Sequence, residues 1–357
     1  MSPKLLALIP SRSDFACLAS VLSHLIADEL SVRALVFSGA LLDQYGDVRD
    51  SLAGIEFTAI PTHVAGARTP GASLGLAMTR LEMELEAAEG VLVVGDRWES
   101  LVALIGAYDN IPIIHIQGGE RSGNIDDRVR DALTVFASLH LVSTEQARQA
   151  LGPLARGEIH VTGCPSLDLC PQNLSRPPEL ASLGSGAAIE GEYLLVIQHP
   201  VTTEYLDVRD QFIETIQAIH GIGMPTVWIT PNVDAGNELA SKALRQCGVS
   251  NIRWFHHFAP ETFWKVLANA SAIVGNSSAG IRQAPYLGVP AVDIGSRQHA
   301  RERIPECRWT DYRAEDIEAA ILDQILHGSR TKSWLYGDGH SGRRCADIIK
   351  RWFSDRV

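Results

Sequence analysis

The chain has 357 residues, which at about 150 residues per domain predicts two domains or slightly more. Hydrophobic residues make up 46% of it and charged residues 20%, as in chains that fold and unlike disordered ones. Lys and Arg total 31 against 42 Asp and Glu, and the net charge of -11 argues against a nucleic-acid or anionic-membrane binder, because both need a basic face. A local basic pocket for one phosphorylated small molecule is still compatible with this charge.

Cysteine usage and the first residues predict an intracellular chain without a metal. The six cysteines are scattered and form no C-x-x-C pair, so zinc and thioredoxin-type sites lose their best support. We expect buried thiols, no metal and no cofactor. The apolar run at 5–10 is too short for a signal-peptide core or a membrane span, and it reads as a first buried strand. We therefore expect a cytoplasmic protein.

The first half of the chain alternates short apolar runs with helical patterns. Strands are predicted at 4–10, 32–37, 90–95, 111–116, 139–143 and 159–163, with helical stretches such as 79–88 and 144–151 between them. Runs that are apolar throughout, without alternation, are typical of strands buried on both faces of a parallel sheet. Strand followed by helix, repeated, predicts a doubly wound α/β sheet.

A stretch rich in Pro, Ser and Gly at 171–192 interrupts this rhythm and reads as a linker. The alternation then resumes, with strands predicted at 193–200, 226–231, 252–257, 272–276 and 289–295 and helices at 204–220, 260–270, 314–326 and 342–353. We predict two Rossmann-like domains, 1–170 and 171–340, facing a cleft, and a C-terminal helix within 341–357 that packs back on the first domain. Ligands of such sheets bind beyond the carboxyl ends of the strands.

Polar residues follow the predicted strands of the first domain. Arg12 comes after the first strand and can hold a diphosphate or be a solvated loop residue. Asp96 is a candidate acid or base, although Asp is also a good N-cap for the next helix. The loop HIQGGERSGNIDD at 115–127 combines glycines, which let a backbone approach a ligand, with Glu120 and Asp126. The alternative for Asp126 is first-turn charge at a helix dipole.

In the second domain the strongest phosphate signal is GNSSAG at 275–280, which contains Ser277, Ser278 and Gly280. Hydroxyls and bare N–H groups at a helix N-terminus form an anion site, and we expect a helix to begin here. The stretch is neither a P-loop nor a dinucleotide fingerprint, which disfavours an ATPase or a dehydrogenase. His199 can bond a phosphate or simply pack. The arginines 297, 301 and 303 can complete a diphosphate pocket or form a charged surface run.

Eight ordered stretches resemble the hydrolysing UDP-N-acetylglucosamine 2-epimerases, which make N-acetylmannosamine for sialic acid and have relatives in the legionaminic acid route. The matching stretches are SRSDF at 11–15, VVGDRWE at 93–99, HIQGGERSGNIDDRVRDALT at 115–134, GCPSLD at 163–168, QHPVTTE at 198–204, TPNVDAG at 230–236, GNSSAGIRQAPYLGVPAVDIGSRQHARER at 275–303 and LYGDG at 335–339. They cover nearly the whole chain. HIxGGE with SGxIDD, and HPVTTE, are similar to the hydrolysing branch in particular.

The resemblance implies a glycosyltransferase-B-like fold, with the nucleotide mainly on the second domain and the sugar facing the first. It also implies a reaction that begins with anti elimination of the nucleoside diphosphate to a 2-acetamidoglucal, followed by addition of water. Its site residues match these positions: catalytic Asp96, Asp126, Glu120 and Gln117, and nucleotide-binding Arg12, His199, Asn232, Ser277, Ser278, Gly280, Gln283, Arg297 and Arg301.

Two positions depart from the family pattern. Gln117 stands where many members have a glutamate implicated in proton transfer, and Gln283 where a glutamate often holds the ribose hydroxyls. A neutral amide cannot be a general base, so proton transfer would fall to Asp96, Asp126 or Glu120. Gln283 can still bond a ribose diol, without charge assistance.

The sequence predicts a hydrolysing 2-epimerase that takes UDP-N-acetylglucosamine, or a related UDP- or GDP-2-acetamido sugar, to the free mannosamine-type sugar. The alternatives are a non-hydrolysing 2-epimerase, a glycosyltransferase of the same fold, and a catalytically silent sugar-nucleotide binding protein. We expect a UDP-sugar as the partner, a homodimer or homotetramer, and no nucleic acid or membrane partner.

Overall fold

A computed structural model describes residues 4–43, 46–64, 71–86, 88–95, 97–177, 179–231, 236–246 and 248–356. The chain forms two compact units. Unit 1 comprises Met1–Arg121, Asp126–Leu169 and Tyr336–Val357, and unit 2 comprises Ser122–Ile125 and Cys170–Leu335. The assignment of a sugar side and a nucleotide side to two domains stays a prediction.

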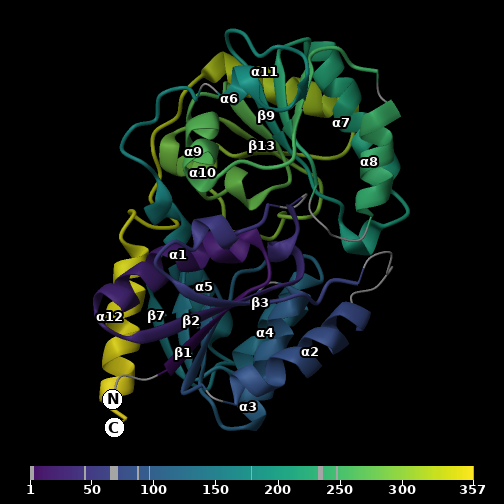
Figure 1. The fold of residues 1–357 in the computed structure, drawn as a ribbon. Helices are drawn as coiled ribbons and strands as arrows, with labels where there is room; N and C mark the ends of the chain where they lie inside the picture. Colours follow the sequence, from purple (N-terminus) through teal and green to yellow (C-terminus); the bar gives the residue numbers. More distant parts are fainter. Residues whose placement is uncertain are drawn as a thin grey trace. The chain divides into compact units, whose positions relative to one another are not determined.

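Unit 1 is built on a seven-stranded sheet whose described ladders are all parallel, in the order β3-β2-β1-β4-β5-β6-β7. The strands are β1 (Lys4–Ile9), β2 (Ser31–Phe37), β3 (Glu56–Ile60), β4 (Gly90–Val94), β5 (Ile113–Ile116), β6 (Leu139–Val142) and β7 (Glu158–Val161). The helices are α1 (Arg12–Ala27), α2 (Gly71–Leu85), α3 (Ala103–Tyr108), α4 (Asp126–Phe136), α5 (Glu145–Leu151) and α12 (Ser341–Ser354) (Figure 1).

Alternate residues of each buried strand face opposite layers of helices. In β1, Leu5, Ala7 and Ile9 pack in one core with α1 and α12, whereas Leu6 and Leu8 pack in another with α2, α3 and α4. Burial on both faces explains why these strands are apolar throughout. The expected doubly wound α/β sheet is confirmed.

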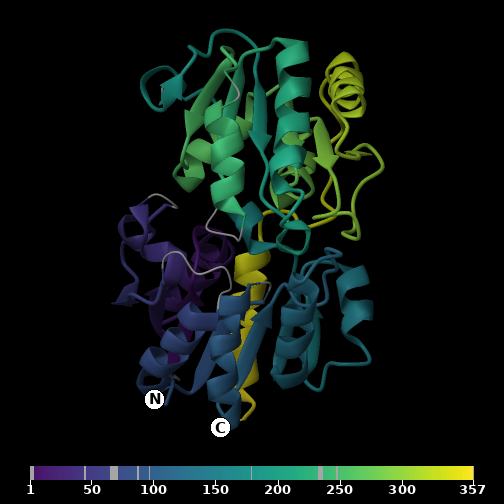
Figure 2. The same cartoon turned by 90° about the vertical axis from the view of Figure 1, so that its right-hand side faces the viewer.

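Unit 2 repeats this plan in a second seven-stranded sheet, ordered β14-β13-β12-β9-β10-β11-β8, in which only β8 is antiparallel to its neighbour. The strands are β8 (Ser185–Gly186), β9 (Leu194–Ile197), β10 (Thr226–Ile229), β11 (Ile252–Phe255), β12 (Ala272–Gly275), β13 (Ala291–Ile294) and β14 (Arg308–Thr310). The helices are α6 (Glu179–Ser182), α7 (Val208–Ile222), α8 (Asn237–Gln246), α9 (Pro260–Ala268), α10 (Gln283–Leu287) and α11 (Ala314–His327). Helices α7 and α11 pack together on one face of this sheet (Figure 2).

The strands that the sequence pattern missed lie at the sheet edges. β3 is an edge strand whose residues are all partly or fully exposed, so it lacks the apolar run that marks the buried strands. β8 and β14 are likewise short edge strands of the second sheet. None of the helices in the described part of the chain is long and apolar enough to cross a membrane.

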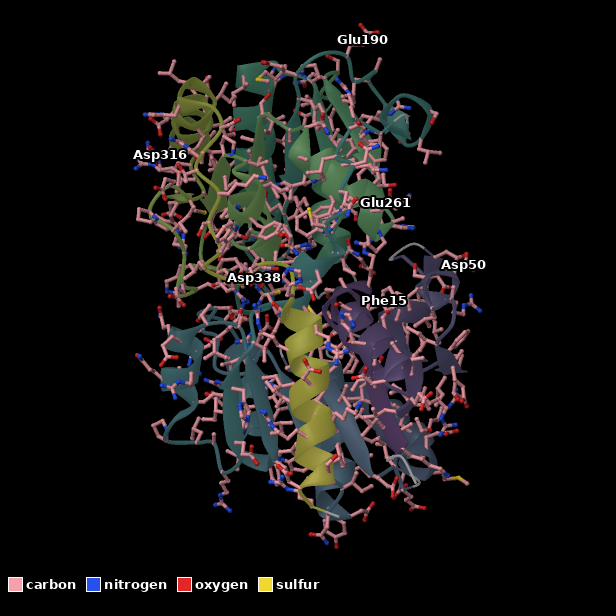
Figure 3. The ribbon with its side chains drawn as sticks, turned by 90° about the vertical axis from the view of Figure 1, so that its left-hand side faces the viewer. Phe15, Asp50, Glu190, Glu261, Asp316 and Asp338 are labelled. Carbon is pink, nitrogen blue, oxygen red and sulfur yellow. The ribbon has the colours of Figure 1, made fainter. Side chains whose placement is uncertain are left out.

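Helix α12 returns to unit 1 and packs against α1 (Figures 1 and 3). Cys345, Ala346, Ile349 and Trp352 enter the same core as the apolar face of α1. The start of α12 is held by Asp168, whose carboxylate accepts from the backbone N–H groups of Ser341 (3.0 Å) and Gly342 (2.6 Å) and from the Ser20 hydroxyl (2.8 Å). A Cβ at Gly342 would lie 2.1 Å from Ser20 Oγ, so the approach of the two helices requires glycine there.

We predict that Asp168→Ala lowers the free energy of unfolding of unit 1 by about 2 kcal/mol, because hydrogen bonds to an ionised group contribute about 1.5–3 kcal/mol and this group also caps a helix. Urea unfolding measures the change. Asp355→Ala, at the exposed opposite end of α12, is the control and should leave stability near wild type. Equal unfolding of both variants would show that the cap contributes nothing.

Candidate functional site

Each sheet changes winding direction once, and the candidate residues follow the strands at or next to these two points. In unit 1 the change lies between β1 and β4, and in unit 2 between β9 and β12. Loops that diverge from neighbouring strands open a crevice at such a point, which is where doubly wound sheets bind ligands.

Arg12 is the first residue of α1, directly after β1. Ser11 caps this helix by accepting a hydrogen bond from the Asp14 backbone N–H at 3.3 Å. Burial lowers the pKa of the Arg12 guanidinium to about 10, and its Nη1 is buried without a hydrogen-bond partner among the described residues. A partly desolvated guanidinium at a helix N-terminus is suited to an anion.

Gln117 lies directly after β5 and is held by two thiols. Its Nε2 donates to Cys164 Sγ at 2.9 Å and to Cys17 Sγ at 3.3 Å, and the residue is only 4% exposed. Its backbone is left-handed, with φ at 63°, which is uncommon for a residue other than glycine. The fold therefore fixes the direction of this amide, and the amide can orient a group but cannot accept a proton.

The acidic residues of the next loop have different surroundings. Arg130, which is 2% exposed, donates to the Glu120 backbone carbonyl and pairs with Asp127, both at 2.7 Å. This assigns Asp127 a structural role. Glu120 is buried at 5% exposure, and Asp126 is the first residue of α4. Asp126 thus combines a helix-start position with partial exposure, so a helix-dipole role and an acid–base role are compatible.

Two predicted site residues, Asp96 and Asn232, lie outside the described residues. The position before Asp96 is nevertheless informative. A Cβ at Gly95 would lie 1.9 Å from Nε2 of the buried His115 side chain, so glycine is required where β4 ends.

In unit 2 the crevice is organised by the fully buried Asn276, which follows β12. Its Oδ1 accepts from the His199 backbone N–H at 2.7 Å, and its Nδ2 donates to the His199 carbonyl at 2.8 Å. We call this pair of hydrogen bonds the Asn276 bridge. It joins the ends of β9 and β12 and places His199 beside the serine turn.

The serine turn is shorter than the helix expected from GNSSAG. Ser277 accepts from the Ala279 N–H at 3.3 Å and opens a single 3-10 turn, Ser278–Gly280, after which Gln283 begins the five-residue α10. The expectation that a helix begins directly at this stretch is therefore corrected. The Ser277 hydroxyl accepts from the N–H two residues later, which closes a 3-10 turn, and the helix begins only at Gln283. Anion binding here would rest on hydroxyls and neighbouring cations more than on a long helix dipole.

The loop 296–303 brings two of the predicted arginines to the same crevice. Arg297 Nη1 and Gln298 Nε2 donate to the Asn276 carbonyl at 3.0 and 3.1 Å, and Arg301 Nε donates to Gln298 Oε1 at 2.7 Å. Arg301 is 5% exposed, which does not fit a solvated charge run. His199, the serine turn, Arg297 and Arg301 are thus assembled around one asparagine.

Residues 122–125 of the SGxIDD stretch belong to unit 2 and contact this loop. Asn124 Nδ2 donates to the Arg297 carbonyl at 3.2 Å, and the Ala300 N–H donates to the Ser122 carbonyl at 3.4 Å. Gly123 has φ at 90°, and a Cβ there would lie 2.3 Å from the His299 ring. Residues 122–125 therefore pack on the loop 296–303 within unit 2.

Asn276, Gln298 and Asn124 were not singled out as site residues from the sequence. All three stand inside quoted motifs, and an amide side chain shortly after a predicted strand is the signal that could have identified Asn276 and Gln298. A cavity of about 370 Å³ adjoins the loop and is lined by Glu204, Gly295, Ser296, His299, Trp309, Asp311 and Tyr312. Its carboxylates disfavour a phosphate there and suit hydroxyl donors.

Comparison with known proteins places the chain. A family profile for UDP-N-acetylglucosamine 2-epimerase matches residues 27–350. The UDP-N,N'-diacetylbacillosamine 2-epimerase (hydrolyzing) of Legionella pneumophila is 29% identical over 98% of this chain and 96% of its own length. The UDP-N-acetylglucosamine 2-epimerase of Neisseria meningitidis is 31% identical, with 97% and 94% covered.

Solved structures show the same fold. The UDP-GlcNAc 2-epimerase of Methanocaldococcus jannaschii in complex with UDP-GlcNAc and UDP superposes with a TM-score of 0.79 at 16% identity, covering 98% of this chain and 99% of that one. A Neisseria meningitidis UDP-GlcNAc 2-epimerase bound to UDP-GlcNAc gives 0.78 at 15% identity, with 98% and 100% covered. The expected glycosyltransferase-B-like α/β fold is confirmed. The chain belongs to the UDP-N-acetylglucosamine 2-epimerase family.

Proposed function

We propose that this family member is a hydrolysing 2-epimerase, which converts a UDP- or GDP-2-acetamido sugar to the free mannosamine-type sugar and the nucleoside diphosphate. The observation that carries the proposal is the Asn276 bridge, which gathers His199, two serines and two arginines at one strand edge, as a diphosphate leaving group requires. The Legionella relative, named as hydrolyzing and matched along its length, supports the hydrolytic outcome.

In the proposed first step a carboxylate removes the proton from sugar carbon 2. The electrons of the C–H bond form the carbon 1–carbon 2 double bond, and the anomeric C–O bond breaks with its electrons leaving on the diphosphate. His199, Ser277, Ser278, Arg297 and Arg301 stabilise the charge that develops on the leaving group. Arg12 is proposed as a further cation, and Gly280 as the last residue of the serine turn that contacts the phosphates.

In the second step water adds to the 2-acetamidoglucal. Its oxygen bonds to carbon 1, and carbon 2 receives a proton on the face opposite to the one that lost the first proton. The acid–base groups we propose are Asp96, Asp126 and Glu120. Gln117 would orient the acetamido sugar, since its amide is held by Cys17 and Cys164. Gln283 and Asn232 are proposed to contact the nucleoside.

We expect incubation with UDP-N-acetylglucosamine, or with a UDP- or GDP-2,4-diacetamido-trideoxy sugar, to release a free epimerised sugar and the nucleoside diphosphate. NMR of the products identifies the sugar, and a panel of these donors identifies the substrate. A nucleotide-linked epimer as the final product would instead indicate the non-hydrolysing reaction. Nucleotide binding without turnover of any donor would indicate a silent binding protein, which the neutral Gln117 makes worth testing.

Asp126→Asn is predicted to lower turnover by about 100-fold or more, the usual scale for a general acid or base, with little change in UDP affinity. Glu120→Gln and Asp96→Asn test the other two carboxylates in the same way. Asp127→Asn is the matched control. The Asp127 carboxylate is next to Asp126 in the sequence but pairs with Arg130, so its loss should affect stability more than turnover. Near-normal turnover of Asp126→Asn would show that Asp126 contributes only its charge at the start of α4 and no proton transfer.

Replacing Ser277 and Ser278 together with Val should weaken UDP binding at least about tenfold, because a lost charge-assisted hydrogen bond costs about 1.5–3 kcal/mol. Calorimetric titration measures the affinity, and circular dichroism checks the fold. Ser250→Val, at an exposed turn of the same unit, should bind UDP as wild type does. Unchanged affinity in the folded double variant would remove the serine turn from the site.

A further inference from the structure

The loop 296–303 is anchored by a buried ion pair that the proposed reaction does not use. Asp293 lies in β13 and is 3% exposed, and its Oδ2 lies 2.9 Å from Nη1 of Arg303. The same guanidinium donates through Nη2 to the Gln298 backbone carbonyl at 2.6 Å. Arg303 therefore ties the end of the loop both to the strand before it and to the middle of the loop.

This anchor continues into the Asn276 bridge. Gln298, whose carbonyl Arg303 holds, donates from its side chain to the Asn276 carbonyl and accepts from Arg301. Asn276 in turn holds the backbone of His199. The Asp293 carboxylate is thus connected, through Arg303 and Gln298, to every cation proposed for the diphosphate in unit 2.

Folding stability gives no reason for an ionised carboxylate at this position. Burial raises the pKa of Asp293 to about 6, although Arg303, Arg297 and His299 oppose the rise. The Cys307 thiol and the Tyr312 phenol also face it, and burial raises the pKa of both, so neither carries charge at neutral pH. Because the folded-state pKa lies above the usual value, ionisation of Asp293 costs stability as pH rises through about 6. Buried ion pairs are weak stabilisers in general, and conformational specificity is one reason to retain them.

We propose that Asp293 is a positioning residue that, through Arg303, holds the loop 296–303 in the conformation that binds a nucleoside diphosphate. The ligand in this inference rests on the proposed function, whereas the order of the loop can be measured without any ligand. Asp293 lies within β13, so opening of the loop would take Arg303 away and leave the carboxylate buried, which raises its pKa further. Protonation then favours the open loop, and nucleotide affinity should fall as pH drops through the pKa.

Hydrogen exchange of the ligand-free protein tests the anchor directly. In Asp293→Asn, amides of the loop 296–303 should exchange about tenfold faster than in wild type at about pH 8, after correction for intrinsic rates. At about pH 5 wild type should approach the variant, because its carboxylate is then protonated. Asp316→Asn is the control, since Asp316 is an exposed partner of Arg313 in the same unit and should leave the loop unchanged.

UDP titration tests the consequence for binding. Asp293→Asn should bind UDP about tenfold more weakly than wild type at about pH 8, and the difference should shrink toward pH 5. UDP itself titrates near pH 6, and the comparison between proteins at equal pH removes that contribution. Arg303→Lys should retain part of the affinity that Arg303→Met loses, since lysine keeps the charge.

Equal loop exchange and equal UDP affinity in wild type and Asp293→Asn at both pH values would overturn the inference. If wild type binds no UDP, the proposed function fails, and the exchange experiment alone decides whether Asp293 positions the loop. If Asp293→Asn does not fold, the pH dependence of loop exchange in wild type and in Arg303→Lys decides it. Loop exchange that does not respond to pH in either protein would then contradict it.

Discussion

The arrangement of the strand ends in unit 2 depends on the hydrogen bonds between the Asn276 side chain and the His199 backbone. Parallel strands end with their polar groups at the same edge of a sheet, and at a winding change no neighbouring strand pairs the residues that follow. Through its side-chain amide, Asn276 hydrogen-bonds both the N–H and the carbonyl of His199, as a neighbouring strand would. Its own carbonyl then accepts from Arg297 and Gln298. The buried amide thereby links the ends of β9 and β12 and positions Arg297 beside them.

In unit 1 the loops at the strand ends lie over a different feature, a pair of buried histidines. His115 and His140 lie on adjacent strands with ring centroids 5.9 Å apart, and both are fully buried. Burial lowers the pKa of His140 to about 4, so it carries no charge at neutral pH. Glycines 95 and 118 leave space for the His115 ring, since a Cβ would lie 1.9 Å and 2.9 Å from its nitrogens. The loops that follow β4 and β5 can therefore run close to the sheet.

Much of this fold was predictable because burial on both faces leaves a plain signature. β4, with every residue buried, is recognisable from its composition, whereas β3, on an edge, follows no apolar pattern. The position of candidate residues was predictable where a polar residue directly follows an apolar strand, as Arg12 and His199 do, whereas their roles stay predictions. Anchoring residues such as Asn276, Gln298 and Asp293 were not, because their role depends on partners 77, 22 and about 10 positions away that only the folded chain brings near. The sequence also over-extended the helix at Ser277, since the hydroxyl that favours a cap does not fix how many turns follow.

The route of the chain through unit 1 has a consequence for synthesis. This unit combines segments that precede and follow unit 2 in the sequence, and its core is completed by α12, which is synthesised after unit 2. Unit 2 is drawn almost wholly from one uninterrupted run, Cys170–Leu335, and can close while α1 still exposes the apolar face that α12 will cover. A chain that ends before α12 would therefore have a complete core in unit 2 and an incomplete core in unit 1. The order in which the two halves mature is the reverse of the order in which they begin.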